Sequence, residues 1–226
     1  MRRLACLAIA AAALGGCGSA TVAELPPAAG PARAPAPTQA PAGRVVPVDA
    51  APAPIAAALR AATTPRETTT GDGKLTAVVD ARARTLELRD PATGRLVASA
   101  PAGVGPTHVA ALGNRLYVTD TAGGALLIFH VSPDRELTLT RRVFLPGSPF
   151  GIAVDPQRGL LWVTLTARNE LVGLTADHQA RPLLRRPTVR RPVAVAVVSG
   201  TVAVAGRDDR VAQLLTEQET QPEDDG

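Results

Sequence analysis

The histidine at position 108 is the residue in this sequence best suited to acid–base chemistry. It stands in the segment Pro-Thr-His-Val-Ala at residues 106–110, and an imidazole has the ordinary pKa that suits a general base near neutral pH. The two other histidines, His130 and His178, do not occupy matching positions. His108 is therefore either a catalytic base or a structural histidine near the start of a strand, and its missing partners favour the structural role.

Two aspartates stand at corresponding places along the chain and are the best candidates for a metal site. Asp80 and Asp120 each follow a short apolar run, but Leu165 and Gly206 occupy the corresponding later positions. Calcium takes six to eight oxygen ligands, which these two carboxylates alone do not supply. Asp155 belongs to an Asp-Pro turn, where its side chain is expected to cap the backbone. We therefore expect no metal and no other cofactor.

A dense group of arginines lies late in the sequence and is a candidate contact for anionic partners. Its members are Arg181, Arg185, Arg186, Arg190 and Arg191. Such a cluster can contact anionic lipid headgroups or wall polymers, whereas on an outer strand the same charges discourage aggregation and need no partner. The second interpretation is favoured. The chain has one Trp, one Tyr and three Phe, too few for base stacking, so no nucleic-acid partner is expected.

The N-terminus carries the pattern of an exported and lipidated protein. Arg2 and Arg3 precede an apolar run at residues 4–14, and the run ends in Leu-Gly-Gly-Cys at residues 14–17, which resembles the lipobox of bacterial lipoprotein signals. A run of this length is a removable signal peptide and is too short to span a bilayer. We expect cleavage after residue 16, lipid on Cys17 and a location on the extracytoplasmic face of the cell membrane. An ordinary signal peptide with an incidental cysteine is the alternative.

The composition places the mature chain outside several chemical classes. The only other cysteine, Cys6, leaves with the signal peptide, so disulfides, cysteine zinc sites and thiol catalysis are excluded. Residues 17–43 are rich in proline and alanine, which predicts an extended tether of about 3.1 Å per residue behind the lipidated cysteine. The acidic residues 216–226 are expected to form a disordered tail.

A repeat with a period of 43 residues organises the rest of the chain. The pattern Pro-x-x-(Ile/Val)-Ala begins at Pro106, Pro149 and Pro192. Each unit contains short runs rich in Val, Leu and Thr between Gly, Pro and Asp, which is typical of antiparallel strands, and no sustained helical period. Four strands in about 43 residues are the content of a propeller blade. The sequence predicts an all-β, propeller-type domain over residues 44–215 with about four blade units, as a closed small ring or an open partial propeller.

These repeats resemble a known family. Arg-Leu-Tyr-Val-Thr-Asp at residues 115–120 and Leu-Trp-Val-Thr at residues 161–164 resemble YVTN-type repeats, and residues 164–174 are similar to actinobacterial YVTN/NHL-type propeller lipoproteins. The resemblance covers residues 74–215 and implies the fold but says little about function. Family members usually have six or seven blades, so the chain resembles a shortened relative. The Pro-x-His at His108 is also similar to the Pro-His-Gly of streptogramin lyases, which open a cyclic ester with a metal bound nearby.

One strand-like segment near the start of the domain has no place in the repeats. The last unit supplies three strands, at residues 193–198, 202–205 and 211–215, and the segment Arg44–Val48 precedes the repeats. We expect this segment to pair beside Val211–Leu215, completing the last blade and closing the ring, because closure removes exposed strand edges. An open arc is the alternative.

Three functions follow from these observations. The favoured one is a membrane-anchored binding or scaffold module for an unknown protein or cell-envelope ligand. The second is a lactonase- or lyase-type propeller enzyme that uses His108. The third is a shortened propeller that has lost its function, and a homo-oligomer such as a dimer of half-rings is compatible with each.

Overall fold

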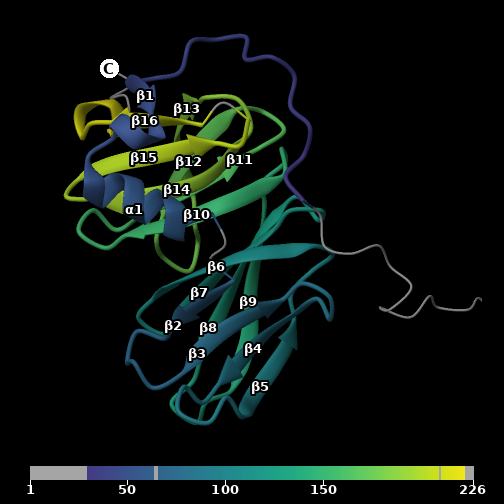
Figure 1. Ribbon diagram of the computed structural model, residues 1–226. Helices are drawn as coiled ribbons and strands as arrows, with labels where there is room; N and C mark the ends of the chain where they lie inside the picture. The colour runs from purple at the N-terminus through teal and green to yellow at the C-terminus, as the bar shows by residue number, and fades with distance from the viewer. Residues whose placement is uncertain (1–29, 64–65, 209, 222–226) are drawn as a thin grey trace, which may run out of the picture.

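A computed structural model describes residues 30–63, 66–208 and 210–221 (Figure 1). The expected signal peptide, Cys17 and the first part of the predicted tether lie outside the described residues. Among the described residues, no helix is long and apolar enough to cross a bilayer.

The fold consists of four antiparallel sheets with four strands each, and consecutive sheets come from consecutive parts of the chain. This confirms the prediction of an all-β, propeller-type domain with four blade units. Blade I contains β2 (Glu67–Thr69), β3 (Thr76–Asp80), β4 (Thr85–Arg89) and β5 (Leu96–Pro101). Blade II contains β6 (Pro106–Leu112), β7 (Arg115–Asp120), β8 (Ala125–Val131) and β9 (Leu137–Phe144). Blade III contains β10 (Pro149–Asp155), β11 (Leu160–Leu165), β12 (Glu170–Thr175) and β13 (Pro182–Pro187).

Blade IV is completed by a strand from the start of the domain. It contains β14 (Pro192–Val198), β15 (Thr201–Gly206), β16 (Val211–Leu215) and β1 (Arg44–Pro47). β1 is antiparallel to β16, with Arg44 opposite Leu214 and Pro47 opposite Val211. Proline is tolerated on an outer strand, where one N–H need not pair. The predicted pairing of this segment is confirmed.

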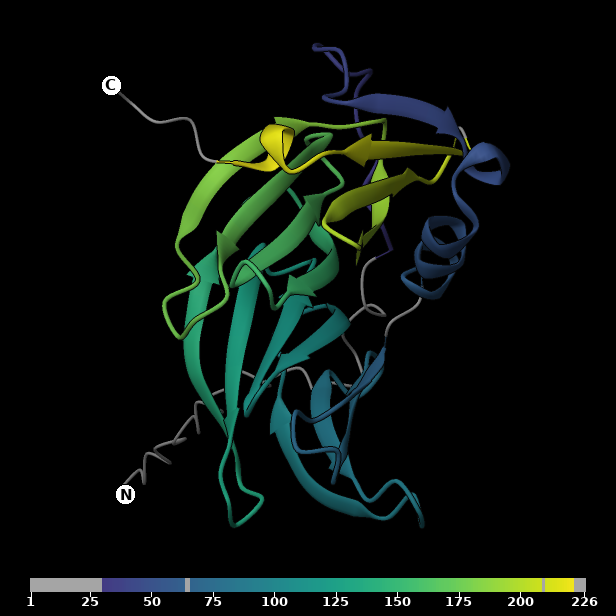
Figure 2. The ribbon, with the colours of Figure 1, turned by 90° about the vertical axis from the view of Figure 1, so that its left-hand side faces the viewer.

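The expected closure of the ring is wrong, and the domain is an open arc. Apolar side chains fill the three interfaces between consecutive blades, with Leu86, Tyr117 and Trp162 among the fully buried ones. Among the described residues, no buried apolar cluster joins blade I to blade IV. Blade I and blade IV lie at opposite ends of the molecule (Figures 1 and 2).

The two ends of the arc avoid exposing a large apolar face in different ways, and this explains why the arc stays open. Helix α1 (Ala53–Ala61) packs Ile55 and Leu59 onto the outer face of blade IV, where a further blade would otherwise pack. At the other end, β3 and β4 alternate between buried residues that face blade II and half-buried, mostly polar ones on the other side. A polar outer face is what a terminal repeat needs for solubility.

The strand directions give the arc two distinct faces. The loop face carries the connections between the second and third strands of each blade and between successive blades, at residues 81–84, 102–105, 121–124, 145–148, 166–169, 188–191 and 207–210. The turn face carries the remaining connections, at residues 70–75, 90–95, 113–114, 132–136, 156–159, 176–181 and 199–200. Two short 3-10 helices complete the fold, η2 (Val48–Ala50) and η3 (Gln218–Thr220).

Residues 30–43, which the sequence assigned to the tether, lie against blades III and IV. The N–H of Ala32 donates to Thr166 Oγ1 at 3.3 Å, and Asn169 Nδ2 donates to the carbonyl of Pro35 at 3.1 Å. Further along, the Gln213 side chain donates to the carbonyl of Ala42 at 2.7 Å. A proline-rich segment leaves carbonyls without intrachain donors, and these side chains provide the donors. We call residues 30–43 the strap.

The start of the predicted acidic tail also differs from the expectation. Residues 218–220 form η3, in which Thr220 is buried and Arg158 Nη1 donates to Thr220 Oγ1 at 2.7 Å. Arg186 Nε donates to the carbonyl of Glu219 at 2.7 Å. Two arginine side chains of blade III thus hold this segment.

Candidate functional site

Each repeated proline opens the innermost strand of a blade with an irregularity in strand pairing. The register shifts between Pro106 and Val109 in blade II, and blade III shows the same shift after Pro149. The N–H of His108 then donates to Thr119 Oγ1 at 3.2 Å, and the N–H of Gly151 donates to Thr164 Oγ1 at 2.8 Å. The threonine of the second strand therefore replaces a backbone acceptor. This explains why the proline pattern and the Tyr-Val-Thr pattern repeat together.

The side chain of His108 is buried at the seam between blades II and III. Its Nδ1 lies 2.9 Å from the carbonyl oxygen of Phe150, and because a carbonyl only accepts, Nδ1 carries the proton. The two rings pack edge to face with centroids 4.6 Å apart. Burial, with a smaller contribution from the charge of Arg66, lowers the pKa of His108 from 6.5 to about 4, although the hydrogen bond to Phe150 opposes this shift. The ring is therefore neutral at physiological pH and binds two blades together.

Three threonine hydroxyls extend this seam, and sequence reasoning missed them. Thr107 Oγ1 lies 2.9 Å from Thr119 Oγ1 and 2.7 Å from Thr121 Oγ1. Thr119 donates to the carbonyl of Phe150 at 2.8 Å, and Thr121 donates to the carbonyl of Pro149 at 2.6 Å. The sequence feature that could have indicated this network was the spacing of the three threonines around the Pro-Thr-His-Val-Ala segment at residues 106–110. A network of buried hydroxyls that ends on backbone carbonyls favours a structural role for the whole seam.

Asp120 holds the loop face of blade II together. Its Oδ1 accepts from the N–H groups of Val104, Gly105 and Gly123 at 3.1, 2.7 and 3.0 Å. Its Oδ2 lies 3.6 Å from Arg142 Nη2. A Cβ at position 123 would lie 1.9 Å from Oδ2, so glycine is required there.

Asp80 also caps a turn, in blade I, but with fewer hydrogen bonds than Asp120. Its Oδ1 accepts from the N–H groups of Arg82 and Ala83, each at 2.8 Å. Asp155 likewise accepts from the N–H of Arg158 at 3.2 Å, as expected for its turn. Within the described ranges, no group of three or more His, Cys, Asp or Glu side chains is placed to hold a metal ion. The structure therefore assigns Asp80 and Asp120 to turn capping on separate blades.

The arginine cluster is distributed over several tasks inside the fold. Arg181 is exposed at the turn before β13. The other four contact distant parts of this chain. Arg185 pairs with Glu170 at 2.8 Å, and Arg186 binds the η3 segment. Arg190 Nη2 lies 3.4 Å from the carbonyl oxygen of Ala34, while Arg191 pairs with Asp208 at 2.8 Å and donates to the carbonyl of Ala32 at 3.2 Å. Arg186, Arg190 and Arg191 thus hold the strap and the C-terminal segment.

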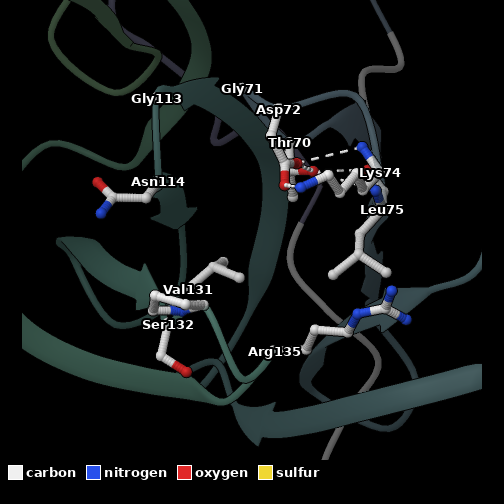
Figure 3. A pocket seen from close by; sticks show the side chains of 11 residues that line it. Thr70, Gly71, Asp72, Lys74, Leu75, Gly113, Asn114, Val131, Ser132 and Arg135 are labelled. Carbon is white, nitrogen blue, oxygen red and sulfur yellow. Dashed lines mark hydrogen bonds and ion pairs between the residues drawn. The ribbon is translucent and has the colours of Figure 1, made fainter.

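A cleft lies on the turn face, between blades I and II. Three turns surround it, at residues 70–75, 113–114 and 131–136, and its volume is about 550 Å³ (Figure 3). The buried Leu75 and Val131 supply apolar surface, and the exposed Asn114 and Arg135 also line the cleft (Figure 3). Sequence reasoning missed this cleft, because the turns of two blades meet only in the folded protein.

A contact between two glycines fixes the shape of the cleft. The N–H of Gly71 donates to the carbonyl of Gly113 at 2.9 Å, which joins the turns of neighbouring blades. A Cβ at position 71 would lie 2.4 Å from that carbonyl oxygen, so a side chain there would separate the turns. The contact therefore fixes the relative position of the two turns that border the cleft.

The charged groups of the cleft are two cations and one anion. Lys74 Nζ lies 3.5 Å from Asp72 Oδ2, and both side chains are largely exposed. Asp72 accepts from Thr70 Oγ1 at 2.7 Å and from the N–H of Lys74 at 3.1 Å, and these bonds lower the pKa of its carboxyl. Arg135 adds the second positive charge among the lining residues, and Asp134 and Glu136 flank it in the same turn. In the sequence, the only lysine of the chain, Lys74, was the feature that could have pointed to this cleft.

Comparison with known proteins identifies the fold without assigning a function. No protein-family model matches the chain, and no curated protein is similar to it in sequence. Solved structures do resemble it. A periplasmic gluconolactonase from Pseudomonas aeruginosa is 20% identical, with a TM-score of 0.58 over 69% of this chain and 50% of that one.

Two further solved structures also resemble this fold. A virginiamycin B lyase from Staphylococcus aureus, solved as an inactive variant with quinupristin, is 15% identical, with a TM-score of 0.54 over 68% of this chain and 52% of that one. A β-propeller domain from Myceliophteria thermophila is 14% identical, with a TM-score of 0.54 over 67% of this chain and 52% of that one. The chain spans about half the length of these structures, and its described residues form a β-propeller fold as an open arc of four blades.

Proposed function

We propose that the protein is a non-catalytic binding module, held on the extracytoplasmic face of the cell membrane by lipid on Cys17, whose turn-face cleft binds a small ligand with one negative charge. The cleft between blades I and II is the observation that carries this proposal. Its walls are fixed by the Gly71–Gly113 contact, so binding costs little rearrangement.

The chemistry of the cleft supports an amphipathic anion. Among the residues that line the cleft, Lys74 and Arg135 are the cations that a ligand carboxylate would contact. An apolar ligand segment would contact Leu75 and Val131, because small-molecule sites combine apolar walls with a few polar groups.

The enzymatic alternative has weaker support. A base must reach the proton that it removes, and His108 is buried with its Nδ1–H donated to Phe150. Asp80 and Asp120 are committed to turns in different blades. These contacts favour a structural use for each residue that resembles a lyase or lactonase site.

Titration with hexanoate, and with hexanol as the uncharged control, tests the ligand class. We expect hexanoate to shift the NMR signals of residues 70–75 and 131–136, and hexanol to shift them much less. Arg135→Gln should weaken hexanoate binding roughly tenfold, since a hydrogen bond to a charged group contributes about 1.5–3 kcal/mol. Arg95→Gln, on a neighbouring turn, is the matched control. Equal shifts with both compounds, or equal loss in both variants, would exclude an anion site.

A further inference from the structure

The arginines of the chain are unevenly divided between the two faces of the arc. The connecting segments of the loop face contain seven arginines and two aspartates, a net formal charge of +5. Those of the turn face contain five basic and five acidic residues, a net charge of zero. Charge of one sign on one face is typical of a surface that meets a partner of the opposite sign.

Most of the loop-face charge is accessible. Arg84 is buried and Arg191 pairs with Asp208. The other five are exposed, and they extend from blade I to blade IV: Arg82, Arg168, Arg190, Arg207 and Arg210. The strap adds exposed Arg33 beside blades III and IV.

An exposed aromatic side chain lies at the same face. β9 runs from the turn face to the loop face and ends at Phe144, whose exposed fraction of 75% is the highest of any large apolar residue described. Val104, in the connection from blade I to blade II, is 49% exposed. Exposed apolar groups beside basic residues are typical of surfaces that enter the membrane interface.

The strap directs this face toward the proposed anchor. Ala32 binds Thr166 and Arg191, both in loop-face connections. Twelve residues lie between Cys17 and Gly30, and an extended chain from one to the other spans at most about 45 Å. The described chain therefore begins beside the loop face, so this is the face nearest the start of the tether.

We infer that the loop face lies on anionic lipid headgroups, with Arg168, Arg207 and Arg210 at the contact. This rests on the anchoring part of the proposed function. In this orientation the cleft between blades I and II faces away from the membrane, open to ligands. Each basic residue near an anionic surface raises affinity about fivefold, the equivalent of about 1 kcal/mol, so the loss of three should weaken binding on the order of 100-fold.

Vesicle cosedimentation tests the inference on the chain from residue 17 onward with Cys17→Ser, which removes the lipid. We expect binding to mixed phosphatidylglycerol and phosphatidylcholine vesicles, none to pure phosphatidylcholine, and release in 1 M salt, where the screening length is about 3 Å. The triple variant R168Q/R207Q/R210Q should lose binding. The control R95Q/R141Q/R181Q removes the same charge from exposed sites elsewhere and should keep it, with circular dichroism melts confirming that both variants fold.

Several results would overturn the inference. They are equal loss in the two triple variants, equal binding to both kinds of vesicle, or binding to soluble polyphosphate with none to vesicles. Failure of the lipid anchor is detected separately, as unmodified Cys17 in the wild-type protein, and failure of the ligand site is detected by the hexanoate titration.

Discussion

The buried His108 makes the stability of this protein depend on pH in a defined window. Its pKa is 6.5 in the unfolded chain and about 4 in the folded protein, chiefly because burial opposes the charged ring. The unfolded state therefore binds more protons between these values. The contribution of His108 to folding is fully present above pH 6.5 and is lost as the pH falls through about 4. The difference corresponds to about 3 kcal/mol.

The substitution His108→Asn isolates this effect. An asparagine Nδ2 can still donate to the Phe150 carbonyl, but it does not titrate. We expect the stability difference between wild type and this variant, from urea unfolding, to change by about 3 kcal/mol between pH 7.5 and pH 4. The acids that titrate below their ordinary values, such as Asp72 and Asp177, cancel in the difference. Parallel pH profiles for the two proteins would refute a buried, neutral His108.

Three further predictions concern the arc and can be checked by thermal and chemical unfolding. Leu59→Ala should cost about 3 kcal/mol, since Leu59 is fully buried between α1 and blade IV. Leu139→Ala on the exposed edge of blade II should cost less than about 0.5 kcal/mol, and equal costs would mean that α1 does not cover blade IV. Deleting residues 44–47 should lower the Tm by several degrees, because blade IV loses its outer strand; an unchanged Tm would contradict the pairing. Gly123→Ala should destabilise by roughly 2 kcal/mol, because its Cβ displaces the Asp120 carboxylate, and a neutral effect would remove Asp120 from its capping role.

The blade pattern could be predicted from the sequence because it depends on local features. The repeated prolines, the alternating apolar residues and the turns recur every 43 residues, and each blade follows from its own segment. The pairing of β1 with β16 was also predictable, since a three-stranded last unit leaves one edge open.

The covered ends could not be predicted, because they depend on surfaces that form only after folding. Blade IV presents small residues to α1, among them Ala194, Ala196 and Ala203, and these let a helix pack closely where another blade would need larger partners. The segment around residues 57–62 showed helix-forming alanines, but nothing in its sequence indicated which surface it covers. The same reason explains the strap, the threonine seam and the cleft.

The identity of the N-terminal residue tests the central claim most directly. The protein should be produced in a bacterium that processes lipoproteins, recovered from its membranes with detergent, and digested for mass spectrometry. We expect an N-terminal peptide that begins at Cys17 and carries the mass of two or three acyl chains, which membrane attachment requires. The Cys17→Ser protein should lack this peptide and leave the membrane on washing with high salt. An N-terminus elsewhere, or an unmodified Cys17 in membrane-bound wild type, would contradict a lipid-anchored binding module.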